Sequence, residues 1–151
     1  MTLRPVLRQL YRSESSLAAA LRTLARRHAA EHEVHHVARD LARWSEEHLA
    51  ELAATGERRG LRLGEAAPTG PHPLVARDDQ LPGDGLLTDL RELHREIAGV
   101  SVDWELLAQG AQAARDSELL QFASRCHPRT LRQLRWSNAM LKVLSPQLLT
   151  S

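Results

Sequence analysis

The feature that most constrains this chain is a long stretch, residues 3–55, that holds no glycine and a single proline, Pro5. One continuous helix of that length would measure about 80 Å at roughly 1.5 Å per residue, which is too long for one small domain. The stretch must therefore fold back on itself. Leucines spaced three or four apart from Leu3 to Leu24 indicate one amphipathic helix. A second apolar stripe, from Val34 to Leu52, indicates another. We expect an antiparallel hairpin of helices 3–28 and 32–55.

The next segment, residues 56–85, holds six of the eight glycines and four of the seven prolines. Such a composition favours a loop, and a loop of this length in a compact domain is typical of a crossover or a mobile segment. A crossover would carry the chain along the bundle before the next long helix begins. We therefore expect residues 1–151 to form a single helical domain with 56–85 as its crossover.

Three further helices are predicted after the crossover. A short one covers 86–99 and ends at Gly99, the next covers about 102–126 with Ser101 as N-cap, and His127-Pro128 separates it from the last, about 128–144. The last helix would turn its apolar side inward and end before Pro146; that side consists of Leu131, Leu134, Leu141 and Leu144. The alternative is one long helix that continues from 86 through Gly99 to Gly110. No segment alternates with a period of two, so the fold class is all-α.

Composition excludes several classes of function. The net charge of +1 argues against binding to nucleic acid or to a membrane surface, since both usually require a large basic excess. The single cysteine, Cys126, excludes an intramolecular disulfide and a cysteine-based zinc site. The chain begins without a signal-peptide pattern and has no apolar run of membrane-spanning length. We expect a cytoplasmic protein.

A cluster of histidines and glutamates, HAAEHEVHH (His28–His36), raises the question of a metal site. At about 100° per residue, its histidines fall on the side of the helix opposite Val34, Val37 and Leu41. The cluster is therefore interpreted as a polar, solvent-facing turn of the hairpin. Two polar residues elsewhere are more informative, because Glu14 and His48 occupy core positions of their stripes. A buried carboxylate is costly unless it is paired or bound to a metal, and the hairpin geometry sets Glu14 opposite residues 44–48.

The segments QLYRSESSLAAALRTLARR (Gln9–Arg27) and LARWSEEHLAEL (Leu41–Leu52) resemble the first two helices of the ferritin-like superfamily, in particular its YciF-like branch of small bacterial stress-associated proteins. The resemblance implies a ferritin-like four-helix bundle made of two antiparallel hairpins, with the short helix in the long crossover, and often a dimer. It also implies that Glu14 corresponds to the first-helix metal carboxylate. If the turn between the two helices is longer than in the family, His48 matches the histidine of the second helix and Ser45 replaces the glutamate of the motif. Without that insertion the same positions are Ala42 and Ser45, and both ligands are lost.

Most other ligands of such a centre are missing. Residues 108–114 offer Gln109 and Gln112 where the resemblance implies carboxylates and a histidine, and residues 128–144 contain no acidic residue. Because two metals need about four carboxylates to balance their charge, a di-iron enzyme is not expected, and we favour a protein without catalytic activity.

Three hypotheses follow. The first is a non-catalytic bundle, without cofactor, that acts by association as a homodimer or with an unknown protein partner. The second is a metal-binding or redox protein with a mononuclear Fe, Mn or Zn site at Glu14 and His48. The third is a small-ligand site in a polar cavity lined by Glu14, His48, Gln109 and Gln112.

Overall fold

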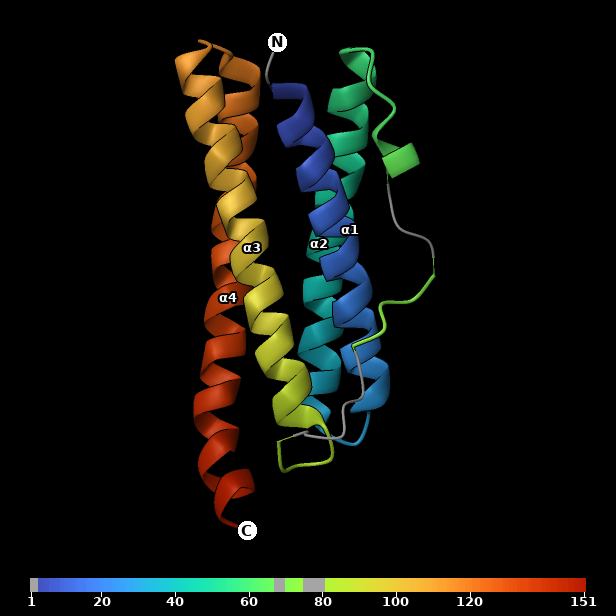
Figure 1. Cartoon of the computed structure of the whole chain (residues 1–151), viewed down its shortest axis with the longest axis vertical. Helices are drawn as coiled ribbons and strands as arrows, with labels where there is room; N and C mark the ends of the chain where they lie inside the picture. Colours follow the sequence, from blue (N-terminus) through green and yellow to red (C-terminus); the bar gives the residue numbers. More distant parts are fainter. Residues whose placement is uncertain (1–2, 67–69, 75–80) are drawn as a thin grey trace.

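A computed structural model describes residues 3–66, 70–74 and 81–151 (Figure 1). These residues form four α-helices and one short 3₁₀ helix, and the described ranges contain no strand. The all-α class is therefore confirmed. The elements are α1 (Leu3–Arg27), α2 (His32–Arg58), η1 (Leu63–Ala66), α3 (Leu86–Ala113) and α4 (Ser117–Thr150). None of the helices in these ranges is long and apolar enough to cross a membrane.

The helices form two antiparallel hairpins, α1 with α2 and α3 with α4, which meet mainly through α1 and α3 (Figure 1). The crossover returns the chain along the bundle, so that α3 starts beside the turn between α1 and α2. Its segment Gly70–Leu74 is held against α1, because Thr23 Oγ1 donates to His72 O at 3.1 Å and Leu74 is buried. Among neighbouring helices, α2 and α4 approach each other least. That side of the bundle is the most open.

The predicted end of a helix at Gly99 is wrong, as is the role of Ser101 as an N-cap. Gly99 lies inside α3, is exposed, and a Cβ added there would meet no atom of the described residues. A glycine inside a helix costs only about 1 kcal/mol relative to alanine, which is small compared with the apolar burial on both sides of it. The buried stripe of α3 runs unbroken through Leu90, Leu93, Ile97, Val100, Trp104 and Leu107. The alternative of one continuous helix was the right one, and it extends beyond Gly110.

The predicted breaks at Pro128 and before Pro146 are also wrong, because α4 continues through both. Proline removes one hydrogen bond to the carbonyl four residues earlier and clashes with it, at a cost of about 3 kcal/mol. At Pro128 this carbonyl belongs to Ser124, and both residues are exposed, so water can satisfy it. The real reversal lies at Ala114–Asp116, where Arg115 takes a positive φ of 56°. That turn contains neither glycine nor proline, which is why the pattern of breakers did not reveal it.

Asp116 fixes both the start of α4 and the contact between the two hairpins. Its Oδ1 accepts from the backbone N–H of Leu119 at 3.2 Å, as an N-cap does. The guanidinium of Arg59, just after α2, donates to both carboxylate oxygens at 2.7 and 2.9 Å. These hydrogen bonds from Arg59 lower the pKa of Asp116 below its ordinary value.

The apolar register predicted for α1 is confirmed, and the inward face predicted for residues 128–144 holds for Leu134, Leu141 and Leu144, which pack against the core, but not for Leu131. Leu3, Leu7, Leu10, Leu17, Leu21 and Leu24 are all buried, as is Glu14 among them. In α4 Leu131 is 40% exposed, and the other three predicted leucines are only half-buried. The buried face is instead continued by Thr130, Gln133, Ser137 and Met140. Polar residues hold inward positions there because Gln133 bridges α4 to α2.

Candidate functional site

Glu14 of α1 and His48 of α2 meet in the interior of the bundle, as their positions in the sequence predict. Glu14 is 0% exposed and His48 is 1% exposed. The Nδ1 atom of His48 lies 2.6 Å from Oε2 of Glu14. An ionised carboxylate can only accept hydrogen bonds, so the proton of this bond belongs to Nδ1. The hairpin thus brings together two residues 34 positions apart in the sequence.

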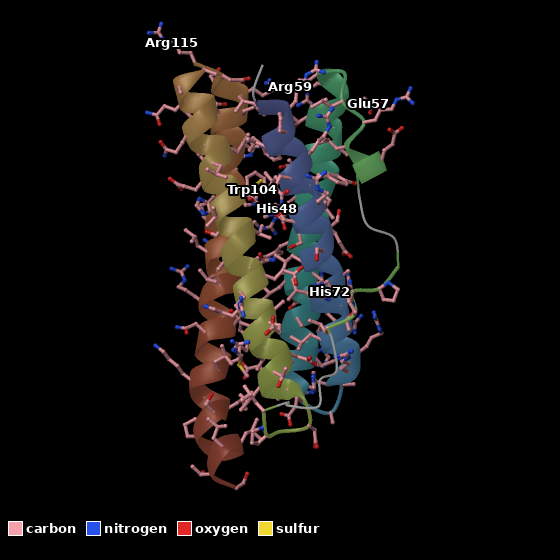
Figure 2. All side chains as sticks on the ribbon, in the orientation of Figure 1. His48, Glu57, Arg59, His72, Trp104 and Arg115 are labelled. Atoms are coloured by element: carbon pink, nitrogen blue, oxygen red, sulfur yellow. The ribbon has the colours of Figure 1, made fainter. Side chains whose placement is uncertain are left out.

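The third member of this cluster is Trp104 of α3, which Figure 2 shows at the level of His48. Its Nε1 donates to the same Oε2 of Glu14 at 3.0 Å, and its ring meets that of His48 edge-on at a centroid distance of 5.4 Å. Trp104 is fully buried, in line with the preference of buried indoles for a hydrogen-bond acceptor. The sequence analysis did not place Trp104 at this site. An unbroken α3 stripe through Gly99 would have been the signal.

The three residues form a hydrogen-bonded triad in which Glu14 Oε2 is bonded to both His48 and Trp104. Two other polar atoms of the triad have no hydrogen-bond partner among the described residues. Within the described chain, Glu14 Oε1 and His48 Nε2 are buried and have no hydrogen-bond partner. Leaving a buried polar atom unpaired costs about 1–3 kcal/mol. A partner for these two atoms would have to come from outside the described side chains.

The positions of the described chain where the resemblance implies further ligands carry no carboxylate. Ser45, which stands where the resemblance implies a glutamate, is buried and its Oγ accepts from Nε2 of Gln133 at 3.0 Å. The same amide nitrogen donates to the carbonyl oxygen of Leu41 at 3.0 Å. Gln109 and Gln112 are exposed, so the predicted polar cavity that combined them with Glu14 and His48 does not form. That hypothesis was wrong because it placed the α3 partner of Glu14 at residues 108–114 rather than at Trp104.

No group of three or more His, Cys, Asp or Glu side chains in the described ranges lies close enough together to hold a metal ion. The arrangement of the triad itself also matters here. Glu14 Oε2 and His48 Nδ1 are hydrogen-bonded to each other, so a metal that took these two atoms as ligands would have to break the 2.6 Å bond between them.

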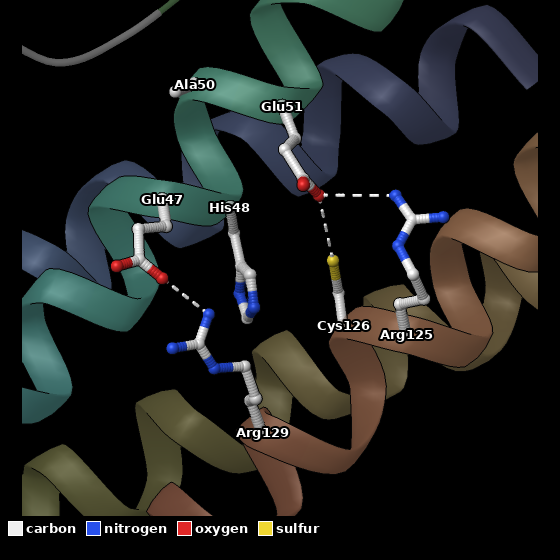
Figure 3. A pocket seen from close by; sticks show the side chains of 7 residues that line it. All are labelled: Glu47, His48, Ala50, Glu51, Arg125, Cys126 and Arg129. Carbon is white, nitrogen blue, oxygen red and sulfur yellow. Dashed lines mark hydrogen bonds and ion pairs between the residues drawn. The ribbon is translucent and has the colours of Figure 1, made fainter.

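A pocket of about 410 Å³ opens between α2 and α4 and reaches His48 (Figure 3). Two ion pairs cross it from α2 to α4: Glu47 to Arg129 at 2.6 Å and Glu51 to Arg125 at 3.5 Å. Each arginine also lies over an aromatic ring. The Cζ of Arg129 is 4.9 Å from the ring centre of Trp44. Arg129 is thus paired with an acidic residue of the neighbouring helix and stacked on an aromatic ring of the same helix.

Cys126 lines the same pocket and is buried, as predicted. Its Sγ donates a weak hydrogen bond to Oε2 of Glu51 at 3.6 Å. Burial, and then the nearby Glu51 carboxylate, raise the pKa of the Cys126 thiol to about 12. Since the thiolate is the reactive form, Cys126 is not an activated nucleophile.

The histidine cluster lies at the turn between α1 and α2, but it is not a uniform solvent-facing stripe. His32 and His36 are exposed, with ring centres 4.4 Å apart. His28, in contrast, lies 2.7 Å from Oδ2 of the buried Asp89 of α3, and Nδ1 of His35 lies 2.8 Å from the carbonyl oxygen of Ala25. The prediction was wrong for these two residues because the helical wheel ignored the neighbouring α3 and the end of α1.

Comparison with protein-family models, with curated proteins and with solved structures finds no match for this chain. The class of the molecule is therefore defined by its own geometry. Within the described residues it is an all-α protein of two antiparallel helical hairpins, with a buried Glu-His-Trp triad at their junction.

Proposed function

We propose that this chain is a ferritin-like bundle without a complete di-metal centre, and that it acts without catalysis, by association with a second copy of itself. The observation that carries the proposal is the triad, in which both His48 and Trp104 are hydrogen-bonded to Glu14. The indole of Trp104 donates to Glu14 Oε2, so Glu14 is engaged by two protein donors. With Glu14 committed to two hydrogen bonds within the protein, the carboxylate that would be the first ligand of a redox centre is already engaged.

The exposed apolar side chains support association on one face. Val102 and Leu106 of α3 are 57% and 53% exposed, and they are one helical turn apart. Leu131 of α4 is 40% exposed. The hydrogen bond of 2.8 Å between Ser101 and His127 sets the register of α3 against α4 at this level. An isologous dimer through the outer face of these two helices would cover all three side chains.

Analytical ultracentrifugation and light scattering test this proposal on protein purified without an affinity tag. We expect a dimer that Leu106→Glu converts to a monomer, because a charge would be buried at the centre of the face. Val143→Glu is the matched control, since Val143 is 63% exposed and lies about three helical turns beyond Leu131 along α4. A monomeric parent protein, or a dimer that survives Leu106→Glu, would contradict the proposed face.

A mononuclear Fe, Mn or Zn site at Glu14 and His48 is the second candidate. It is favoured by the two buried atoms without partners in the described chain, Glu14 Oε1 and His48 Nε2. Metal analysis of untagged protein separates the two candidates. Near-stoichiometric metal that is lost in Glu14→Gln would establish the metal site and remove the first proposal, whereas metal-free protein whose melting temperature is unaffected by these ions would remove the second.

A further inference from the structure

The pocket between α2 and α4 is lined by His48, whose ring lacks one hydrogen-bond partner within the described residues. His48 lines it and is 1% exposed, while its Nε2 has no hydrogen-bond partner among the described residues. Its other ring nitrogen is held by Glu14, which fixes the orientation of the imidazole. Figure 3 shows this ring pointing from α2 into the space between Arg129 and Cys126. The pocket is thus lined by a histidine whose ring is held by Glu14 and whose buried Nε2 has no hydrogen-bond partner among the described residues.

The walls of the pocket supply hydrogen-bond donors at fixed positions. Arg129 lies over Trp44 at 4.9 Å, and Arg125 lies over Phe122 at 5.7 Å. Cation–π contacts of this kind hold a guanidinium in place independently of its carboxylate partner. Each guanidinium has five N–H groups, and each of these two arginines faces one carboxylate in the pocket. Most of the N–H groups of the two arginines are therefore not bonded to the carboxylates of the pocket.

The two carboxylates at the rim can be exchanged at small cost. The side chains of Glu47 and Glu51 are 60% and 51% exposed. Exposed ion pairs are worth about 0–1 kcal/mol, because water and salt screen them. A ligand that offers Arg129 a bidentate partner inside the pocket can therefore replace Glu47 without a large penalty.

We propose that the α2–α4 pocket binds a small oxyanion, a carboxylate or a phosphate, through the guanidinium groups of Arg129 and Arg125 and through Nε2–H of His48. To donate to the anion, His48 must carry a proton on Nε2 as well as on Nδ1, and the bound anion and the Glu14 carboxylate would then lie on either side of the doubly protonated ring. The site is separate from the dimer face proposed above, and it stands whether or not that dimer forms.

Thermal unfolding and NMR of the full chain test the site, with inorganic phosphate and acetate as probes and NaCl at matched ionic strength as reference. At a tenfold excess over Kd, a ligand that binds only the native state raises the melting temperature of a chain of this size by about 3–6 °C. We expect such a rise with at least one probe, together with a change in the ¹⁵N resonance of His48 Nε2. A response to phosphate alone would identify a phosphate site, and a response to both probes a general carboxylate and phosphate site.

Four variants make the test specific. Arg129→Gln is expected to abolish the shift and Arg125→Gln to reduce it. Glu47→Gln is expected to increase the affinity severalfold, because it releases Arg129 from its competitor. Arg135→Gln, an exposed arginine elsewhere on α4, is the control and should bind as the parent does. The proposal is overturned if neither probe exceeds the NaCl reference, if Arg129→Gln binds as the parent, or if Glu47→Gln weakens binding. It is also overturned if Zn²⁺ rather than an anion moves the Nε2 resonance.

Discussion

We expect the Glu14 carboxylate to stabilise the bundle, although it lies in an otherwise apolar stripe of α1. Glu14→Leu restores an unbroken leucine stripe in α1, and by apolar patterning alone it would stabilise the helix. The structure predicts the opposite, because the substitution removes the shared acceptor of Trp104 Nε1 and His48 Nδ1. Each buried donor left without a partner costs about 1–3 kcal/mol. Removing one partner of a buried ion pair typically costs about 3–5 kcal/mol, because the other partner is left as an uncompensated charge.

We therefore expect Glu14→Leu to lower the free energy of unfolding by about 3–5 kcal/mol, measured by urea unfolding with circular dichroism detection. The triple variant Glu14→Leu, His48→Leu, Trp104→Phe removes the donors together with their acceptor. It should regain most of this loss and fall within about 1–2 kcal/mol of the parent, because replacing a buried polar cluster with apolar residues of similar volume is often close to neutral.

Glu46→Gln is the matched control for a carboxylate at the surface, since Glu46 forms an exposed ion pair with Arg22 at 2.6 Å. It should change stability by less than about 1 kcal/mol. The reasoning fails if Glu14→Leu is as stable as the parent. It also fails if the triple variant is as destabilised as the sum of its single variants, because the triad would then not act as a unit.

Other substitutions and modifications have expected outcomes that denaturation or chemical labelling can check. Gly99→Ala should stabilise the protein by about 0.5–1 kcal/mol, since a methyl group meets no described atom there and the helix gains propensity; destabilisation would mean that α3 is not continuous at Gly99. Asp116→Ala should cost about 1–2 kcal/mol at neutral pH, more than Asp116→Asn, which keeps the N-cap. Because Arg59 lowers the folded pKa of Asp116, the ion-pair contribution to stability is present above the unfolded pKa near 3.8 and is lost as pH falls through the folded value. The stability difference between Asp116→Asn and the parent should therefore shrink in stronger acid. A difference that persists unchanged there would contradict this. Cys126 should react with iodoacetamide at pH 8 much more slowly in the folded than in the unfolded chain, since its folded pKa is about 12. The raised pKa also stabilises the fold below pH 9.0, and that stability should decline as pH rises from 9.0 towards 12.

The positions of α1 and α2 were predictable because their information is local. Every buried leucine of α1 follows from spacings of three and four, and the turn after Arg27 follows from the length that a small domain can hold. The same regularity made Glu14 and His48 stand out as polar exceptions in apolar stripes. An antiparallel hairpin that turns near residue 30 sets them at the same level of the bundle. The sequence alone thus determined the all-α class, the first hairpin and two of the three members of the triad.

The second hairpin was decided by tertiary packing. Gly99 and Pro128 are local helix breakers, but both residues are exposed to solvent while the opposite side of the helix is buried. No local rule reveals which side will be buried, and with the false breaks in place Trp104 could not be assigned to the level of Glu14. The pocket beside His48 also depends on how far α2 lies from α4, a distance set by the packing of the two hairpins through α1 and α3. Spacing along one helix carries no record of that separation.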